Sequence, residues 1–341
     1  MGRLMRFQDV VICSVSALEA PHRVSSLELE ERLRPLLKRL GFAPGVIASL
    51  SGVVARRFWD EGTQPSEVAA KAGEQAILRS GLPRSDIGVL VNTSVCRDFI
   101  EPSTASLVHE RLGLSADCLN FDLSNACLGF IHGMDLAARM IERGEIKAAL
   151  VVDGEGSRYI VDKTIERLNA TGDARMFAES FATLTLGSGA AAMVLAHRDV
   201  FPEGHTYRGS VTLAATEHSQ LCRGKDEWMV TDGNKLLVAG LELAKRTFER
   251  AKDELSWTAE VLAEVVVHQV SRQHTDRLAA ALGIAPDRIH SIFPEHGNIG
   301  PASVPMVLAK ADDAGRMQKG DRVALMGIGS GLNCAMAEVV W

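Results

Sequence analysis

The sequence predicts an α/β fold in which helices cover a largely parallel sheet. Short runs of aliphatic and β-branched residues alternate with stretches of helical periodicity along the chain. The second half also repeats the pattern of the first. Such alternation is typical of parallel strands joined by helices. With 341 residues, 46% of them hydrophobic, the chain is long enough for one large α/β unit or two fused halves.

The elements of the first half follow from periodicity and from helix boundary signals. A helix at residues 27–40 is predicted because Ser25 or Ser26 can cap it, acidic residues lie near its start and Gly41 can end it. Further strands are expected at residues 7–18, 87–93, 148–152 and 186–195, after the turn at 51–57, and directly before Cys127. Further helices are expected at residues 66–78 and 104–112, and directly after Cys127. Residues 156–185 have helical patterns with a polar break at 169–173, which indicates an inserted segment.

Four elements of the second half match elements of the first half in the same order. Residues 265–269 match 89–93, 278–284 match 107–114, 289–293 with the following loop and helix match 119–123, and 319–325 match 143–150. We interpret this as an internal duplication of a β-α-β-α-β unit; the alternative is two unrelated α/β units. The turn-rich residues 197–210 place the boundary, giving an N-terminal half at 1–200 and a C-terminal half at 201–341.

Composition excludes several classes of function. A net charge of −6 and a pI near 6.0 argue against a nucleic-acid partner. The six cysteines are dispersed without a Cys-x-x-Cys motif, so we expect neither a disulfide framework nor a metal site, and a reducing cytoplasm is the expected location. The N-terminus has no apolar signal segment, Arg6 breaks the myristoylation pattern, and no apolar run is long enough to span a bilayer.

Cys127 ends an apolar run and precedes a helical pattern in which Met134, Ala137, Ala138 and Ile141 share one face. The thiol is therefore expected where a strand turns into a helix. Free amides and the positive end of the helix dipole gather there, and both favour a thiolate, which is a good nucleophile for acyl transfer. The alternative is a small cysteine in the hydrophobic core.

His268 follows the second-half run 265–267, which matches the strand before Thr93. Asn298 follows residues 289–293, which match the strand before Cys127. The carboxyl ends of strands are where α/β sheets place ligands. Read alone, His268 could be a buried histidine with its hydrogen bonds satisfied, and Asn298 an ordinary turn residue in a Gly-rich loop. Together with Cys127 they would form a nucleophile with two donors for a developing oxyanion or enolate.

Two Gly-rich segments and an arginine pair allow more than one interpretation. Residues 327–333 resemble a phosphate-binding loop, but they lie too near the C-terminus to open a helix, which excludes a dinucleotide fingerprint. Glycines that let the backbone approach an active site fit better, here and at 187–189, with an ordinary tight turn as the alternative. Arg56 and Arg57 could contact a phosphate, although a solvated strand edge is the simpler interpretation.

Several segments carry a resemblance to a known family. They are Asn-Ala-Cys-Leu-Gly-Phe at 125–130, Val-His-Gln at 267–269, His-Gly-Asn-Ile-Gly-Pro-Ala-Ser at 296–303 and Gly-Ile-Gly-Ser-Gly at 327–331. They resemble the thiolase superfamily and, more narrowly, the chain-initiating type III ketoacyl synthases. Residues 92–106 and 331–341 are similar to the OleA group, enzymes that join two fatty acyl-CoAs head to head at the start of long-chain olefin synthesis.

The resemblance implies a five-layered αβαβα thiolase fold and a homodimer. By position Cys127 matches the acylated nucleophile, and His268 and Asn298 match the pair that binds the thioester oxygen of the second chain. The backbone amides of Cys127 and Ser330 match the oxyanion hole. Glu101 matches a glutamate that reaches the partner subunit's site. No cofactor is implied beyond the coenzyme A thioesters, whose contact residues stay open because residues 56–57 depart from the carrier-protein enzymes.

The function expected from this resemblance is a non-decarboxylative Claisen condensation of two long-chain acyl-CoAs. An unactivated α-carbon is a weak acid, so its proton has to be removed by a base, and Glu101 is the candidate for this role. Because Glu101 lies between Phe99-Ile100 and Pro102, we expect a loop that carries the carboxylate into the partner's acyl channel with a raised pKa. One alternative is a decarboxylative synthase III that uses a malonyl carrier protein. Another is a non-catalytic acyl-binding subunit.

Overall fold

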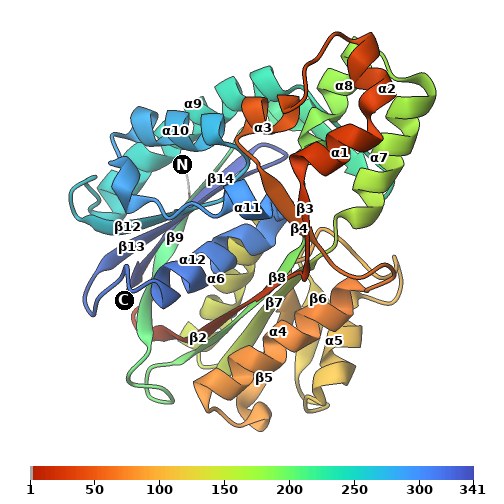
Figure 1. The fold of residues 1–341 in the computed structure, drawn as a ribbon. Helices are drawn as coiled ribbons and strands as arrows, with labels where there is room; N and C mark the ends of the chain where they lie inside the picture. Colours follow the sequence, from red (N-terminus) through yellow and green to blue (C-terminus); the bar gives the residue numbers. More distant parts are fainter. Residues whose placement is uncertain (1–2) are drawn as a thin grey trace.

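The structure is a computed structural model that describes residues 3–341. One large sheet runs through it (Figure 1). In spatial order its strands are β12 (Leu262–Val267), β13 (Arg322–Gly329), β14 (Asn333–Val340), β9 (His205–Ala214), β2 (Val10–Glu19), β8 (Gly189–His197), β7 (Ala148–Glu155), β5 (Ile87–Asn92) and β6 (Leu119–Asp122), with β1 (Arg3–Arg6) paired to β9.

The sheet is mixed rather than largely parallel, which corrects the expectation from the sequence. Only the pairs β12–β13, β5–β6 and β5–β7 are parallel, and the other ladders of this sheet are antiparallel. β13 and β14 are joined by three residues, 330–332, and only antiparallel strands can be joined by so short a turn.

Helices divide this sheet into the expected five layers. Helices α9 (Gly233–Leu255) and α10 (Arg272–Leu282) cover the outer face of the β12–β9 half, and α4 (Pro65–Ser80) and α5 (Thr104–Leu112) cover the outer face of the other half. Helices α6 (Gly129–Glu142) and α12 (Ser303–Asp313) lie between the two halves (Figure 1). A thiolase-type fold is thus confirmed.

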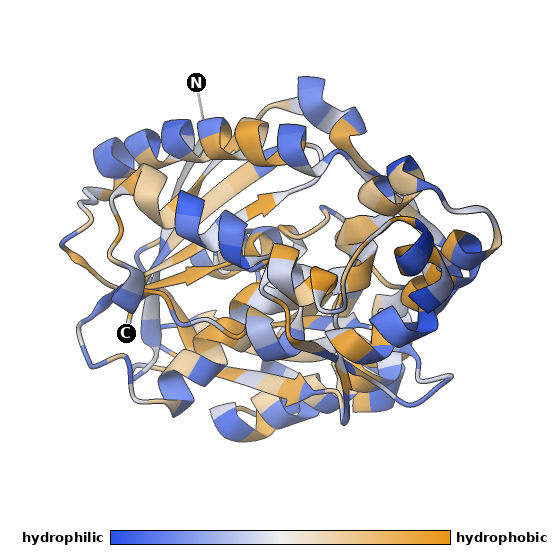
Figure 2. Cartoon of the chain, turned by 45° about the horizontal axis from the view of Figure 1, so that its top comes forward, coloured by the Kyte–Doolittle hydropathy of each residue, from blue (hydrophilic) through white to orange (hydrophobic). Residues whose placement is uncertain are grey.

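The central layer is held by apolar packing on both sides of α6 and α12. Phe130, Met134 and Ile141 of α6 and Met306 of α12 are fully or almost fully buried in one cluster that includes strand residues from both halves. Figure 2 shows the strands and central helices as predominantly hydrophobic, while hydrophilic residues mark the outer helices. A helix buried between the two halves of the sheet needs apolar residues on more than one of its sides.

The segment predicted as one helix at 27–40 is two helices, α1 (Ser26–Arg32) and α2 (Arg34–Arg39). Ser25 caps α1 and forms a capping box with Glu28, as the sequence indicates. The break at Leu33 precedes Pro35, which lacks the amide hydrogen that would continue the ladder.

The second half lacks the strand expected at 289–293. The side chain of Gln269 takes the place of a strand partner there: its Oε1 accepts from the amides of Ile292 and Phe293 at 2.8 and 3.0 Å, and its Nε2 donates to the His290 carbonyl at 2.6 Å. The chain therefore enters the short helix α11 (Phe293–His296) without a strand. The other matched segments occupy corresponding elements: β5 and β12, α5 and α10, and β7 and β13.

Smaller elements surround one end of the sheet. They are β3 (His22–Ser25) paired with β4 (Ala55–Phe58), α3 (Val46–Ser51), α7 (Arg158–Thr171), α8 (Ala174–Ser180), and β10 (Cys222–Lys225) paired with β11 (Trp228–Thr231). The inserted segment predicted at 156–185 is helical, with its break between α7 and α8. Within residues 3–341, no helix is both long and apolar enough to cross a membrane.

Candidate active site

Cys127 lies in a sharp turn between β6 and α6, as the sequence predicts. Ala126 has a φ of 46°, a left-handed conformation that is uncommon for a residue with a side chain. The amides of Leu128 and Gly129 donate to the carbonyls of Asn125 and Ala126 at 3.1 and 3.0 Å, which closes the turn. Strained backbone of this kind is found where a functional side chain has to be aimed, and here it directs the Cys127 thiol into a cavity.

The glycines of 327–331 let β13 approach this turn closely. A Cβ atom on Gly327 would lie 2.5 Å from Cδ2 of Leu128, and one on Gly329 would lie 3.4 Å from the amide nitrogen of Cys127. These distances support the close-approach interpretation over a simple tight turn. Ser330 follows directly and lines the same cavity as Cys127. At the other Gly segment, a Cβ on Gly187 would lie 1.8 Å from the His296 carbonyl oxygen, so only glycine fits.

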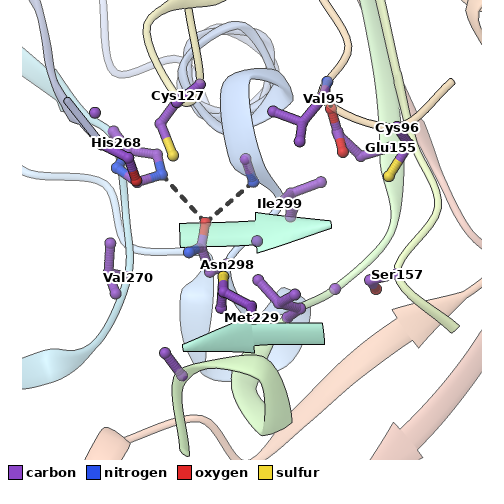
Figure 3. A pocket seen from close by; sticks show the side chains of 18 of the residues that line it. Val95, Cys96, Cys127, Glu155, Ser157, Met229, His268, Val270, Asn298 and Ile299 are labelled. Carbon is purple, nitrogen blue, oxygen red and sulfur yellow. Dashed lines mark hydrogen bonds between the residues drawn. The ribbon is translucent and has the colours of Figure 1, made fainter. Parts of the chain in front are cut away.

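His268 and Asn298 meet opposite Cys127. His268 Nε2 lies 3.1 Å from Asn298 Oδ1, and the same oxygen accepts from the Gly300 amide at 3.0 Å. Figure 3 shows the Cys127 sulfur pointing toward the space beside this pair. The structure therefore brings together the three side chains that the sequence singled out.

The amide of Gly300 fixes how Asn298 is oriented. A backbone amide only donates, so the atom that it contacts is the oxygen of the Asn298 side chain and not its nitrogen. The NH₂ group consequently occupies the other branch of the side chain, where it is a donor. Because Oδ1 accepts from His268, Nε2 of His268 carries the hydrogen. The NH₂ group of Asn298 is thus a donor at the site, and the Nε2–H of His268 donates to Asn298 Oδ1.

Burial controls the protonation of both reactive groups. It lowers the pKa of His268 to about 4, so the imidazole is neutral near pH 7. Burial also raises the pKa of the Cys127 thiol to about 12, with smaller contributions from Cys222 and Glu155. The expected thiolate is therefore not favoured: the amide of Cys127 itself lowers the pKa of the thiol, but loss of hydration outweighs this effect.

A cavity of about 840 Å³ connects these groups. Cys127, His268, Asn298 and Ser330 all line it, together with apolar residues of α9, α10, β13 and β14. This volume is at the upper end of the range for single-ligand pockets, roughly 300–1,000 Å³. Such a cavity can hold a long apolar ligand whose reactive end lies at the thiol.

Glu101 is not part of this cavity in the single chain. It is exposed on the loop before α5, beside the exposed side chains of Phe99 and Ile100. The loop conformation expected around Pro102 is present. The expected approach to a partner subunit's site concerns a second chain and stays a prediction.

Glu155 is a cavity residue that the sequence analysis missed. Its Oε1 accepts from the amide of Val95 at 2.6 Å, and its side chain lies close to Gly300. Burial raises the pKa of Glu155 and that of Asp153. The charge of the neighbouring Glu155 raises the pKa of Asp153 further. The signal was available, because these carboxyls follow the buried strand of 148–152 just as His268 follows 265–267.

The arginine pair does not form a solvated edge. Arg56 is fully buried, and its Nη2 donates to the Leu184 carbonyl at 2.9 Å and to Ser26 Oγ at 3.1 Å. Burial lowers its pKa to about 10. Arg57 lies 3.6 Å from the carboxylate of Glu19. Arg56 therefore joins three segments of the chain, which corrects the interpretation from the sequence.

Within the described chain, no group of three or more His, Cys, Asp or Glu side chains is placed to hold a metal ion.

Comparison with known proteins gives the family. Residues 121–210 match the family model described as 3-oxoacyl-[acyl-carrier-protein (ACP)] synthase III, and residues 253–341 match its C-terminal counterpart. The chain is 51% identical to the acyl-CoA:acyl-CoA alkyltransferase of Xanthomonas campestris pv. campestris, covering 99% of this chain and 100% of that one. The Shewanella oneidensis protein of the same name is 40% identical over 99% of this chain and 100% of its own.

A β-ketoacyl-[acyl-carrier-protein] synthase III from Natranaerobius thermophilus is more distant, at 28% identity over 86% of this chain and 90% of its own. The crystal structure of cerulenin-bound Xanthomonas OleA superimposes with a TM-score of 0.97 at 50% identity, covering 99% of this chain and 98% of that one. The identity, the coverage and the shared fold lead to one conclusion: the chain belongs to the OleA family of acyl-CoA:acyl-CoA alkyltransferases, acyltransferases of the thiolase superfamily.

Proposed function

We propose that the protein condenses two long-chain fatty acyl-CoA molecules without decarboxylation, the first step of long-chain olefin synthesis. The observation that carries this proposal is the convergence of Cys127, His268 and Asn298 in one large, mainly apolar cavity. The names of the curated relatives support the choice of acyl-CoA for both substrates. The product is a 2-alkyl-3-oxoalkanoate.

In the first half-reaction, the sulfur of Cys127 attacks the carbonyl carbon of an acyl-CoA. The thiol gives up its proton, the new C–S bond forms, and coenzyme A leaves as the protonated thiol. The backbone amides of Cys127 and Ser330 stabilise the oxyanion of the intermediate. Because the pKa of Cys127 is raised by burial, the thiol must lose its proton during the attack, and the leaving thiolate of coenzyme A takes up this proton.

In the second half-reaction, a second acyl-CoA loses a proton from its α-carbon to Glu101. The N–H groups of His268 and Asn298 hold the resulting enolate oxygen. The α-carbon attacks the acyl-Cys127 carbonyl, the C–C bond forms, and the C–S bond to Cys127 breaks with return of a proton to the thiol. Water then hydrolyses the remaining thioester and releases the β-keto acid. None of these steps needs a cofactor beyond coenzyme A.

The role of Glu101 requires a homodimer in which each subunit completes the other's site. Strand β6 is an edge strand of the large sheet and pairs only with β5 in the part of the chain that the structure describes. Leu119 on this strand is 56% exposed, and Phe99 and Ile100 beside Glu101 are 57% and 94% exposed. An open strand edge next to exposed apolar side chains is a typical protein interface.

Pairing of two copies along this face would cover Phe99 and Ile100 and carry Glu101 toward the partner subunit. The cytoplasm is the proposed location, because the six cysteines are all free and would stay reduced there.

One experiment tests the proposed function. The protein is incubated with palmitoyl-CoA alone, and the products are identified by mass spectrometry while carbon dioxide is measured. We expect a condensed β-keto acid, release of coenzyme A and no carbon dioxide. A strict requirement for a malonyl thioester would indicate a decarboxylative synthase III instead. Absence of any acyl group on Cys127 in the intact-protein mass would indicate a non-catalytic acyl-binding subunit.

A further inference from the structure

Helix α9 has a glycine at position 240, near its middle and on the side that lines the cavity. Glycine is the poorest helix former after proline, so its presence inside a helix needs a reason. The usual reasons are a positive φ or close contact with a neighbouring element. Gly240 has a helical backbone and does not have a positive φ.

Close packing explains two other glycines inside helices but does not explain Gly240. A Cβ on Gly73 in α4 would lie 3.1 Å from Leu112, and a Cβ on Gly133 in α6 would lie 2.8 Å from Thr93. A Cβ on Gly240 would meet its nearest atom, Cγ2 of Ile328, at 3.7 Å, which is ordinary van der Waals contact. The sheet therefore leaves room at Gly240 for at least a methyl group.

Gly240 is nevertheless buried, so the space beside it lies inside the protein. One turn away along α9 the cavity is lined by Leu237 and Ala244. Opposite, it is lined by Ile328 of β13, by Leu278 of α10, and by Cys334 and Met336 of β14. A buried space with apolar walls is suited to an apolar ligand.

We propose that Gly240 sets the upper length of the alkyl chain that this part of the cavity, beside α9 and Ile328, accepts. The inference rests on the proposed function, because the occupant is one of the two alkyl chains of the condensation. Because residue 240 has no side chain, methylene groups can lie against α9 beside Ile328, in the cavity that both residues line. The Cβ of a side chain at position 240 would already be in contact with Ile328, so a side chain larger than that of alanine would extend into this part of the cavity and take up the space.

Substitutions of increasing size at position 240 test this inference. Wild type, Gly240→Ala, Gly240→Val and Gly240→Leu are compared with octanoyl-CoA, dodecanoyl-CoA and palmitoyl-CoA, by coenzyme A release and product mass. We expect Gly240→Leu to keep most of its turnover with octanoyl-CoA and to lose about tenfold or more with palmitoyl-CoA, since methylenes that no longer fit are discriminated by about that factor. Gly240→Val should be intermediate.

Two further variants separate this effect from a general disturbance of the helix. Gly240→Ala should raise the melting temperature, because alanine favours the helix and the structure has room for its methyl group. Val238→Leu adds volume to the exposed face of the same helix, where Val238 is 66% exposed, and should leave the chain-length profile unchanged.

The outcomes distinguish this inference from the proposed function. If wild type releases coenzyme A from none of the three substrates, the proposed function fails. If wild type is active and Gly240→Leu slows all three chain lengths by the same factor, the length role of Gly240 is wrong and the proposed function stands. Should Gly240→Leu fail to fold, the Ala and Val variants decide in the same way, since an unchanged chain-length profile in both overturns the inference.

Discussion

His268 Nε2 and Asn298 Oδ1 lie 3.1 Å apart, although thirty residues separate them in the chain. The contact ties the end of β12 to the loop after α11. Asn298 is held independently by the Gly300 amide, so each residue positions the other. Both donors are neutral and held in place before substrate binds, and the Nε2–H of His268 has only to shift from Asn298 Oδ1 to reach an enolate oxygen.

The first prediction concerns this pair. His268→Ala or Asn298→Ala should slow condensation by about 10²–10³, the usual effect of losing one donor from a preorganised oxyanion hole. Acylation of Cys127 should be affected less, because in the proposed mechanism backbone amides hold its oxyanion. Single-turnover acylation and full product formation are measured separately, with Asn169→Ala on the exposed surface as the control. An equal loss in both half-reactions would contradict the enolate role.

The second prediction concerns the thiol. Cys127→Ala should abolish acyl transfer and leave the melting temperature nearly unchanged, because little volume is removed. The control is Cys13→Ala, a partly buried cysteine that packs on the α4 side of the sheet. In the wild-type protein, alkylation of Cys127 by iodoacetamide should be slow at pH 7 and should keep accelerating with pH into the alkaline range, since its pKa is raised to about 12. Rapid alkylation that levels off near neutral pH would show a stabilised thiolate instead.

The third prediction concerns acid stability. The pKa of His268 is about 4 in the folded protein and near 6.5 when the chain is unfolded. The unfolded state therefore binds the extra proton between these values, and His268 should lower stability progressively as the pH falls from 6.5 to 4. Its contribution to the slope is at most about 1.4 kcal/mol per pH unit. Denaturant unfolding of wild type and His268→Gln across this range measures it, and a Gln variant with the wild-type slope would refute the assignment.

The sequence singled out three side chains that share one cavity, but it did not predict the direction of the strands. Cys127, His268 and Asn298 could be found because polar residues that follow buried apolar runs stand out in one dimension. Glu155 follows the same rule at the end of β7 and could have been found the same way. The pKa of Cys127 could not, because it depends on how completely the surrounding chain removes water from the thiol.

Strand direction and the missing strand needed tertiary information. Periodicity reports that a run is buried and extended, but not whether its neighbour is parallel, so the antiparallel ladders of β8, β9 and β14 were not predicted. The segment 289–293 looks like a strand in sequence. In the fold, the Gln269 side chain satisfies its backbone instead. The burial of Arg56 was not predicted for the same reason, because the carbonyls to which it donates belong to segments distant in sequence.

The last prediction concerns Glu101. Glu101→Ala should still become acylated at Cys127 but should fail to form the carbon–carbon bond, because the α-proton of the second acyl-CoA is not removed. Glu110→Ala is the matched control, since Glu110 is an exposed carboxylate on α5, a few residues further along the chain. Intact-protein mass spectrometry reports acylation, and product analysis reports condensation. Normal condensation by Glu101→Ala would remove the proton-abstraction role.

Whether Glu101 acts in the partner subunit is decided by complementation. Glu101→Ala and Cys127→Ala should each be inactive in condensation, but a heterodimer of the two would hold one site with the intact Cys127 of one chain and the intact Glu101 of the other. If Glu101 acts across the interface, co-expressed chains carrying different affinity tags should recover up to about half of the wild-type activity after purification on both tags. If Glu101 serves its own chain, every site in the heterodimer lacks one of the two groups and no activity returns. Because the exposed Phe99 and Ile100 place this loop on an apolar face rather than in the cavity of its own chain, we expect recovery.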